Sequence, residues 1–278
     1  MQHFETSWQS KDGLELYIQG WEPDGKLAAV VCLVHGLGEH SGRYVHVADF
    51  LTKSGYALFA FDLRGHGRSQ GPRGHSPSFE AYMEDIGLLI QEAEQRYPGR
   101  PLFLYGHSLG GLLVLNYVLW RKPHLVGVIA TGAGLRSPLL DQKLKIAMAR
   151  VLGSLLPSLS LSTGLDAATL SRDPDVVQAY VESPLVHDRA TLGMTKNSIA
   201  AIPWVLAHAE EFSTPLLLMH GTSDRLTYPQ GSQEFAQLVS CDCTLKLWEG
   251  LYHEIHNEPE QGEVFAFLLN WLESKREA

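Results

Sequence analysis

Cysteine is scarce in this sequence, and basic residues are not in excess. The three cysteines form no disulfide framework, because Cys32 lies inside an apolar run and Cys241 and Cys243 are too close for an ordinary bridge. No His/Cys cluster surrounds them, so no metal site is expected. Three free thiols are typical of a reducing compartment. The formal net charge of −9 argues against nucleic-acid binding, which needs a basic face.

Targeting and membrane-spanning segments are also missing from the sequence. Residues 1–10 have no apolar core, so no signal peptide is expected. The longest apolar-rich stretch, residues 139–156, carries charged residues such as Asp141 and Arg150 and is therefore not a membrane span. Phosphate-loop, dinucleotide and metal-ligand motifs are missing too, so we expect neither a cofactor nor a metal. These absences favour a cytoplasmic protein without a nucleic-acid partner.

The composition is that of an ordinary globular protein, with 45% hydrophobic and 19% charged residues. Apolar runs alternate with segments of helical spacing, which predicts a mostly parallel sheet with right-handed crossovers after an initial hairpin. Strands are predicted at residues 4–9, 14–21, 30–34, 56–61, 102–105, 125–130, 215–221 and 244–248. Helices are predicted at residues 44–53, 79–97, 112–120, 231–239 and 260–275.

The alternation of strands and helices breaks between residue 136 and about residue 207. Helical patterns and loops occur there, but no strand pattern. The break predicts an α/β core of residues 1–135 and 207–278 with an inserted helical cap, residues 136–206. Both ends of the cap then adjoin the strand ends where open α/β sheets carry their sites.

The sequence Gly106-His107-Ser108-Leu109-Gly110 is the organising motif of the chain. It lies between an apolar run typical of a buried strand and a longer one typical of a buried helix, which is the context of a nucleophile elbow. Such a turn needs its glycines, exposes the hydroxyl of Ser108 and directs the amide of Leu109 toward an oxyanion. The pentapeptide also occurs by chance, so the hypothesis depends on the other parts of a serine hydrolase.

An acid and a histidine follow the serine in the order that an α/β-hydrolase triad requires. Asp224 and His253 each come after a predicted strand. We predict that Asp224 orients His253, which takes the proton of Ser108. A turn or helix-cap role is the alternative for Asp224. His256 is the rival base, and it lies farther from the strand end.

The second oxyanion donor is expected in the loop after an early strand. Gly36 and Gly38 bracket Leu37 there, which suits a backbone amide that must face a ligand. We therefore assign the amide of Leu37, together with that of Leu109. His107, beside the serine, is expected to pack behind the site.

A charged loop follows the next strand and contains Asp62, Arg64, His66 and Arg68. One interpretation is a second catalytic site. The favoured interpretation is a hydrogen-bonded network that braces the neighbouring loop of His35.

These segments resemble the α/β-hydrolase superfamily and, within it, the monoacylglycerol lipase and lysophospholipase group. The matching segments are HGLGEHSGRY at 35–44, DLRGHGRS at 62–69, GHSLGG at 106–111, YH at 252–253 and HNE at 256–258. The resemblance implies a triad of Ser108, Asp224 and His253, with oxyanion amides at Leu37 and Leu109. It also implies hydrolysis of a monoacylglycerol to fatty acid and glycerol through an acyl-enzyme intermediate. The insertion matches this group only in position and helical character.

The sequence therefore indicates the reaction more clearly than the substrate. The alternatives are a broad carboxylesterase or a lysophospholipase that acts on short- to medium-chain esters, a peptidase on the same fold, and a ligand-binding protein that has lost turnover. An intact triad argues against the last. Serine at position 108 argues against dehalogenases and epoxide hydrolases of this fold, which use an aspartate nucleophile.

The predicted helix at residues 139–156 has more apolar residues than one packing stripe needs. We expect Met148, Leu152, Leu156 and Ile202 to line a tunnel for one acyl chain. The rim of this tunnel would make transient contact with a micelle or membrane surface. Each buried methylene contributes roughly 0.8 kcal/mol, so a medium chain gains several kcal/mol there. The alternative is that the surplus apolar residues pack within the cap.

Overall fold

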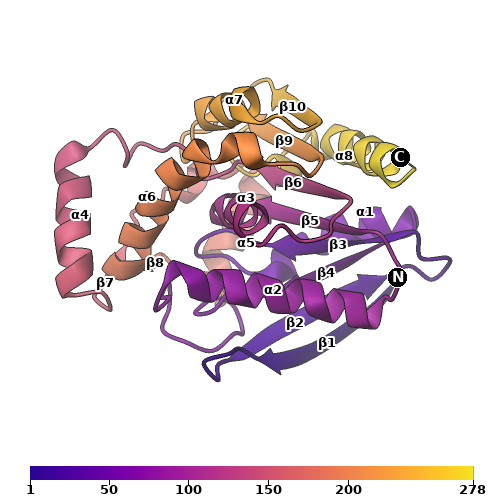
Figure 1. The fold of residues 1–278 in the computed structure, drawn as a ribbon, viewed down its shortest axis with the longest axis horizontal. Coiled ribbons are helices and arrows are strands. Elements are labelled where there is room, and N and C mark those ends of the chain that lie inside the picture. The colour runs from indigo at the N-terminus through magenta and orange to yellow at the C-terminus, as the bar shows by residue number, and fades with distance from the viewer. Residues whose placement is uncertain (278) are drawn as a thin grey trace.

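An eight-stranded sheet forms the centre of the computed structural model, which describes residues 1–277 (Figure 1). Its strands are β1 (Gln2–Gln9), β2 (Glu15–Glu22), β3 (Ala29–Val34), β4 (Tyr56–Phe61), β5 (Leu102–His107), β6 (Gly127–Thr131), β9 (Leu216–Gly221) and β10 (Cys243–Trp248). The spatial order is β1-β2-β4-β3-β5-β6-β9-β10. β2 pairs antiparallel with β1 and β4, and all other neighbours are parallel. The predicted fold class is confirmed.

Helices cover both faces of the sheet. They are α1 (Val45–Lys53), α2 (Phe79–Arg96), α3 (Leu109–Arg121), α7 (Pro229–Leu238) and α8 (Gln261–Arg276). β3 shows why two covered faces produce continuous apolar strands. Val30, Cys32 and Val34 belong to the hydrophobic cluster shared with α2 and α3. Val31 and Leu33 belong to the cluster shared with α1 and α8 on the other face.

The insertion between β6 and β9 contains three α-helices and a small ribbon. The helices are α4 (Lys143–Leu155), α5 (Pro174–Glu182) and α6 (Leu192–Ala207). The expectation that this segment has no strand was wrong, because β7 (Ser160–Ser162) and β8 (Arg189–Thr191) pair antiparallel. Strands of three residues are too short to show a periodic pattern, which is why the sequence does not reveal them.

Helix α6 joins the insertion to the core. Its residues Met194, Ala201, Ile202 and Val205 belong to the same hydrophobic cluster as α2 and α3. The hydrophobic core therefore continues past the expected boundary at residues 206 and 207. Helix α6 is therefore part of the main hydrophobic core and not a separate layer on its surface.

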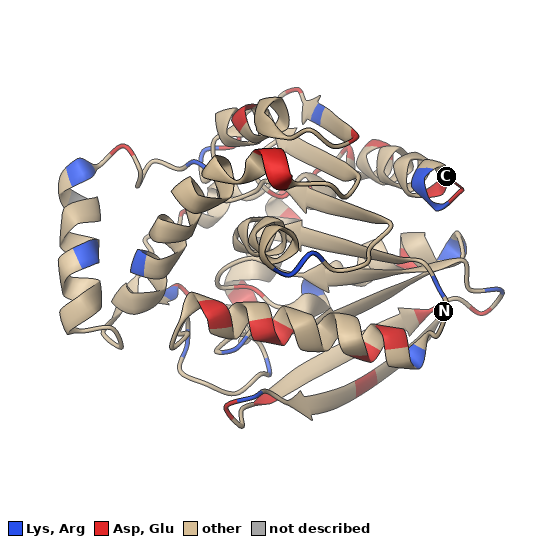
Figure 2. Ribbon diagram, in the orientation of Figure 1, with Lys and Arg blue, Asp and Glu red and all other residues tan. Residues whose placement is uncertain are grey.

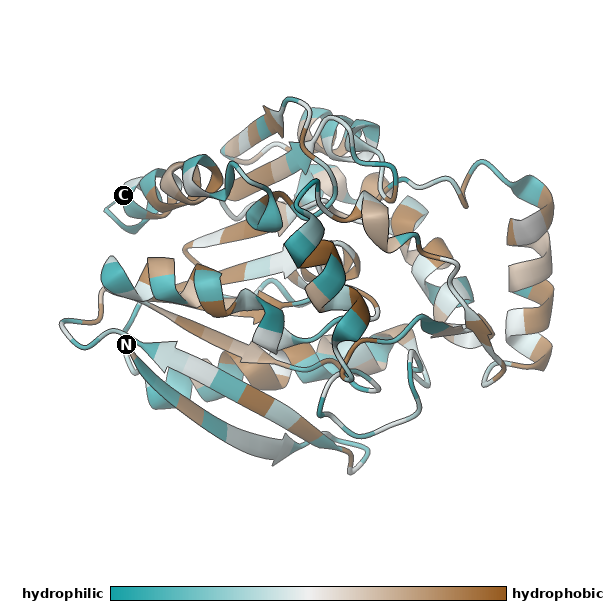
Figure 3. Cartoon of the chain, turned by 180° about the vertical axis from the view of Figure 1, so that it is seen from behind, coloured by the Kyte–Doolittle hydropathy of each residue, from teal (hydrophilic) through white to brown (hydrophobic). Residues whose placement is uncertain are grey.

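Helix α4 packs against α6 and stands at the edge of the molecule, which is visible from both sides (Figures 1 and 3). It begins at Lys143, later than expected, because the preceding residues form turns in which Gln142 N donates to Leu139 O. The apolar residues Leu144, Met148, Val151 and Leu155 follow one another at helical spacing and are all exposed. In residues 1–277, no helix is both long and apolar enough to cross a bilayer.

The insertion is hydrogen-bonded to the loops at the carboxyl ends of the strands. His187 N donates to Gly38 O at 2.9 Å, and Thr191 N donates to Gly74 O at 2.9 Å. Both glycines have positive φ, and a Cβ on Gly38 would overlap the carbonyl oxygen of His187. The approach of the insertion to these loops thus requires glycine.

Replacement of Gly110 should test the closest packing in the core. A Cβ on Gly110 would overlap the carbonyl oxygen of Val34, so α3 must move away from β3. We expect Gly110→Ala to lower the free energy of unfolding by about 3 kcal/mol or more. Gly262→Ala is the matched control, because a Cβ there meets nothing within 4 Å. Chemical denaturation measures both, and equal stability of the two variants would contradict the packing described.

Candidate active site

Ser108 occupies a strained turn between β5 and α3. Its φ of 55° and ψ of −115° lie outside the regions that non-glycine residues normally adopt. A Cβ on Gly106 would overlap the carbonyl oxygen of Gly110, so the turn tolerates no side chain there. The backbone holds the serine in place, because Ser108 N donates to Thr131 O at 2.9 Å and Gly134 N donates to Ser108 O at 3.0 Å.

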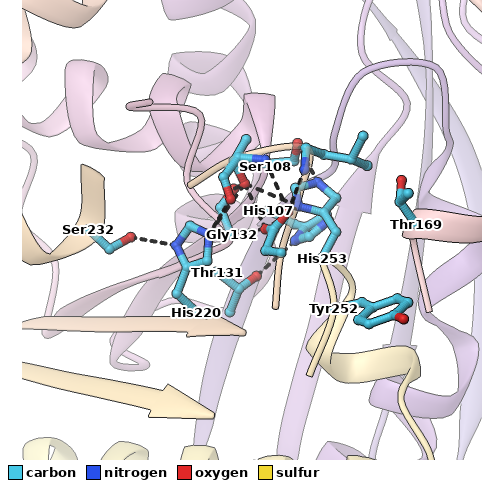
Figure 4. A network of polar contacts seen from close by, with 12 residues as sticks. His107, Ser108, Thr131, Gly132, Thr169, His220, Ser232, Tyr252 and His253 are labelled. Carbon is cyan, nitrogen blue, oxygen red and sulfur yellow. Dashed lines mark hydrogen bonds and ion pairs between the residues drawn. The ribbon is translucent and has the colours of Figure 1, made fainter. Parts of the chain in front are cut away.

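The structure brings Ser108, His253 and Asp224 together from three separate loops. Figure 4 shows Ser108 and His253 within this network of polar contacts. His253 Nε2 lies 2.9 Å from Ser108 Oγ. His253 Nδ1 lies 2.7 Å from Asp224 Oδ2. The contacts link a hydroxyl, a ring and a carboxylate in the geometry in which a base can activate a serine.

The Asp224 carboxylate is buried and saturated with donors. Oδ1 accepts hydrogen bonds from the amides of Leu226 at 2.8 Å and Thr227 at 3.0 Å. Oδ2 faces the rings of His253 and His220. Burial by itself would raise the pKa of Asp224, but the charge of His253 and hydrogen bonds from both histidines hold that pKa far below its usual range. The carboxylate is therefore ionised at neutral pH.

His253 is almost completely buried, and its protonation is set by opposing effects. Burial by itself would lower its pKa, because a charged ring is poorly solvated there. The charge of Asp224 and the hydrogen bond to it, reinforced by the charges of Glu254 and Glu39, outweigh burial and raise the pKa of His253 above its ordinary value.

His256, the rival base, lies behind the site. Its ring stacks on Tyr44 with 4.8 Å between ring centroids. Within residues 1–277 neither of its ring nitrogens has a hydrogen-bond partner, and burial lowers its pKa to about 3. His107 lies between it and His253 and pairs with Thr131 Oγ1 at 3.0 Å. The base that faces Ser108 is therefore His253.

The loop that carries Leu37 lies directly against the serine. A Cβ on Gly36 would be 3.1 Å from the Cβ of Ser108. The amide of Gly36 is occupied, since it donates to Glu39 Oε1 at 2.6 Å. Leu109 is the first residue of α3, where helix amides have no partner within the helix. This arrangement leaves the amides of Leu37 and Leu109 as the candidates for an oxyanion hole.

A buried ion cluster flanks this loop, and its members have no role that local sequence patterns indicate. Arg43 donates to Glu39 Oε2 at 2.8 Å and to both carboxylate oxygens of Glu254 at 2.6 and 2.7 Å. Its guanidinium lies over the ring of Tyr180 on α5, 4.8 Å from the centroid. Glu39 and Arg43 lie inside the motif at residues 35–44, which was the only signal for them. Glu254, beside His253, gave no signal.

The charged loop at residues 62–69 braces the neighbouring loop of His35, as predicted. Asp62 Oδ1 accepts from the amide and the hydroxyl of Ser41 at 2.8 and 2.6 Å. Leu63 N donates to His35 Nε2 at 2.9 Å. Arg64 turns away from the site and forms a bidentate ion pair with Asp85. The bracing interpretation is confirmed.

The four apolar residues expected to line an acyl tunnel are not brought together. Ile202 is buried in the main hydrophobic cluster, and Leu152 is partly buried on α4. Met148 and Leu156 are 51% and 52% exposed. The side of α4 that meets α6 carries small residues, and a Cβ on Gly153 would lie 2.6 Å from Leu192 O. The larger apolar side chains therefore point outward.

The sheet, the strained serine turn and the Ser–His–Asp arrangement define an α/β-hydrolase. The chain belongs to the family described as "Serine aminopeptidase, S33", whose model matches residues 25–260. In residues 1–277, no group of three or more His, Cys, Asp or Glu side chains is placed to hold a metal ion.

Relatives and solved structures cover nearly the whole chain. A monoacylglycerol lipase of Mycolicibacterium smegmatis is 35% identical, over 97% of this chain and 97% of its own length. An uncharacterized abhydrolase domain-containing protein of Dictyostelium discoideum is 41% identical over 96% of this chain, which spans only 29% of that protein. The crystal structure of a Paleococcus ferrophilus monoacylglycerol lipase is 38% identical with a TM-score of 0.85, covering 99% of this chain and 100% of its own.

The pH dependence of kcat/KM should show the effect of the Asp224 charge on the pKa of His253. Activity requires the neutral ring of His253, so it should fall as pH drops through the pKa of that ring. Because this pKa is raised, the acid limb of kcat/KM should lie above about 6.5, the ordinary value for histidine. Asp224→Asn should fold but lose about 10⁴-fold in kcat. A soluble ester is the substrate for these measurements, and an acid limb well below 6.5 would contradict the assignment.

Proposed function

We propose that this protein is a serine hydrolase that cleaves the carboxylic ester of a monoacylglycerol, releasing fatty acid and glycerol. The contact of His253 Nε2 with Ser108 Oγ at 2.9 Å, backed by Asp224, is the observation that carries the chemistry. The full-length similarity to monoacylglycerol lipases supports the substrate class.

In the proposed mechanism, Ser108 Oγ attacks the ester carbonyl while His253 Nε2 accepts its proton. The amides of Leu37 and Leu109 donate to the oxyanion that forms. His253 then returns the proton to the departing glycerol oxygen, leaving an acyl-enzyme. Water, activated by the same ring, releases the fatty acid. Asp224 keeps the ring oriented and stabilises its charged form throughout.

We further propose that the cap and its surroundings select one acyl chain. Ile202 and Leu152 are the buried and half-buried apolar candidates for contact with that chain. Met148 and Leu156 extend the exposed apolar surface instead. Each methylene removed from water contributes roughly 0.8 kcal/mol, so binding should strengthen with chain length before it levels off.

The exposed apolar stripe of α4, comprising Leu144, Met148, Val151 and Leu155, is proposed to contact a micelle or membrane surface. Leu144 and Leu155 are 75% and 71% exposed, which is unusual for leucine. The helix carries basic but no acidic residues in a chain of net charge −9 (Figure 2). The proposal is thus of a cytoplasmic enzyme that acts at the periphery of a lipid phase, with no nucleic-acid partner.

Ser108→Ala should remove the nucleophile and lower turnover by several orders of magnitude, since triad residues act as a unit. A fluorophosphonate should label the native protein once and leave the variant unlabelled. Hydrolysis should then be compared across monoacylglycerols, triacylglycerols, lysophospholipids, acetate esters and aminoacyl amides. Monoacylglycerols should be preferred. A preference for acetate esters would indicate a carboxylesterase instead. A preference for lysophospholipids would indicate a lysophospholipase, and a preference for amides a peptidase.

Leu155→Asp should weaken action on long-chain esters selectively, because a charge on the stripe opposes contact with lipid. We expect the specificity constant to fall about tenfold for a palmitate ester and to stay unchanged for an acetate ester. Val181→Asp is the matched control, since Val181 is an exposed apolar residue on α5, outside the stripe. Equal losses on acetate, octanoate and palmitate esters would show that the stripe has no role in substrate access.

A further inference from the structure

A second histidine contacts the same carboxylate oxygen of Asp224 as His253 does. His220 lies near the carboxyl end of β9, four residues before Asp224, and is completely buried. Its Nε2 is 3.0 Å from Asp224 Oδ2, and its Nδ1 is 2.8 Å from Ser232 Oγ on α7. Figure 4 shows the ring of His220 between Ser232 and the catalytic residues.

The surroundings of His220 determine which nitrogen carries the hydrogen. Nε2 faces the ionised Asp224 Oδ2 and the carbonyl oxygen of Thr227 at 2.9 Å, and the hydroxyl of Thr227 lies farther away at 3.4 Å. The two nearer partners cannot donate, and the Thr227 hydroxyl has closer acceptors in Gly132 O and Asp224 Oδ2, both at 2.9 Å, so Nε2 is the N–H of the ring. In the neutral ring Nδ1 then accepts the hydroxyl proton of Ser232, which is also fully buried. The direction of this hydrogen-bond chain is thereby fixed.

The result is a pair of Ser–His units that share one carboxylate. On one side Ser108 and His253 do chemistry, and on the other Ser232 and His220 donate toward Asp224 without access to substrate. The Asp224 Oδ2 atom accepts from both rings, so its negative charge is divided between them. A donor on one side weakens the hold of the carboxylate on the ring at the other side.

We propose that His220, oriented by Ser232, is a positioning residue that acts on the reaction through Asp224. Its Nε2–H fixes Oδ2 and takes up part of the carboxylate's charge. His253 is then held firmly enough to be oriented and loosely enough to give its proton to the departing alcohol oxygen. This inference rests on the proposed roles of Ser108, Asp224 and His253.

His253 must both accept and release a proton in each half of the reaction. Without His220, the undivided charge of Asp224 would favour the protonated ring. His253 would then remain unable to accept the proton of Ser108 up to a higher pH. The other groups that surround His253 would be unchanged, namely Glu254, Glu39, their partner Arg43, and the rings of His107 and His256.

The test compares His220→Leu, which removes the donor, with His220→Gln, which keeps an N–H donor of similar reach. With a soluble ester, His220→Leu should move the acid limb of kcat/KM upward by about one pH unit. Near pH 6 it should lose about tenfold in kcat/KM, and near pH 9 it should recover to within about threefold of the native protein. KM should stay unchanged. In His220→Gln the acid limb should lie at its native pH. In Ser232→Ala the acid limb should move upward, by less than in His220→Leu.

A structural role alone would lower activity equally at all pH values, in proportion to lost stability. Leu217→Val is the control, because Leu217 is buried on the same strand but faces the other hydrophobic cluster. It should lower the thermal midpoint without moving the acid limb. An unmoved limb in folded His220→Leu, or a limb shifted to lower pH, would overturn the inference.

The pH dependence of fluorophosphonate labelling separates this inference from the proposed function. Labelling needs Ser108 and a neutral His253 but no natural substrate. If the native protein is labelled yet hydrolyses no ester, the proposed substrate is wrong, and the effect of His220→Leu is still read from the labelling profile. If esters are hydrolysed and neither profile moves in His220→Leu, only the role of His220 is wrong.

Discussion

The close approach of helix α3 to the end of strand β3 is the constraint on which the site depends. The helix can reach the strand only because Gly110 presents a bare Cα to the carbonyl oxygen of Val34. This approach forces the turn at Ser108 into dihedrals that cost of order 1–3 kcal/mol. Packing of the helix, whose residues 109–119 are all buried, offsets that cost. The reactive hydroxyl is thus held by the core of the protein and not by its surroundings in the site.

The remaining parts of the site are held by long-range contacts that include the insertion. The amide of Glu254, next to His253, donates to Leu170 O in the insertion at 2.8 Å, and His187 N donates to the loop of Leu37 through Gly38 O. The loop of His253 and the loop of Leu37 are therefore each attached to the same inserted segment. A change in the insertion can alter the geometry of catalysis without touching substrate.

Sequence patterns indicate the elements well where the physical signal is local. The strands β3 to β6 are continuous apolar runs because both faces are covered. Ser108 and Asp224 each follow such a run, and His253 follows the alternating strand β10. The cluster of Glu39, Arg43 and Glu254 joins residues more than two hundred positions apart, which no local spacing reveals.

The orientation of α4 was misjudged for a related reason. Helical periodicity shows which residues share a face but not which face meets the neighbouring helix. The structure turns Gly153 of α4 toward α6 and leaves the stripe of Leu144, Met148, Val151 and Leu155 outward. In the sequence, His220 is only one residue of a buried strand, because its contact with Asp224 forms across a turn.

Helices α6 and α4 are attached unequally to the core, so substitutions are less tolerated in α6 than in α4. Residues of α6 such as Ile202 and Val205 belong to the hydrophobic core, so their replacement lowers the free energy of unfolding. The outward residues of α4 contribute little to that core. Selection can therefore remodel α4 while the fold stays above its stability threshold. Under the lipid contact proposed above, changes that suit a different acyl ester would accumulate first on that one helix.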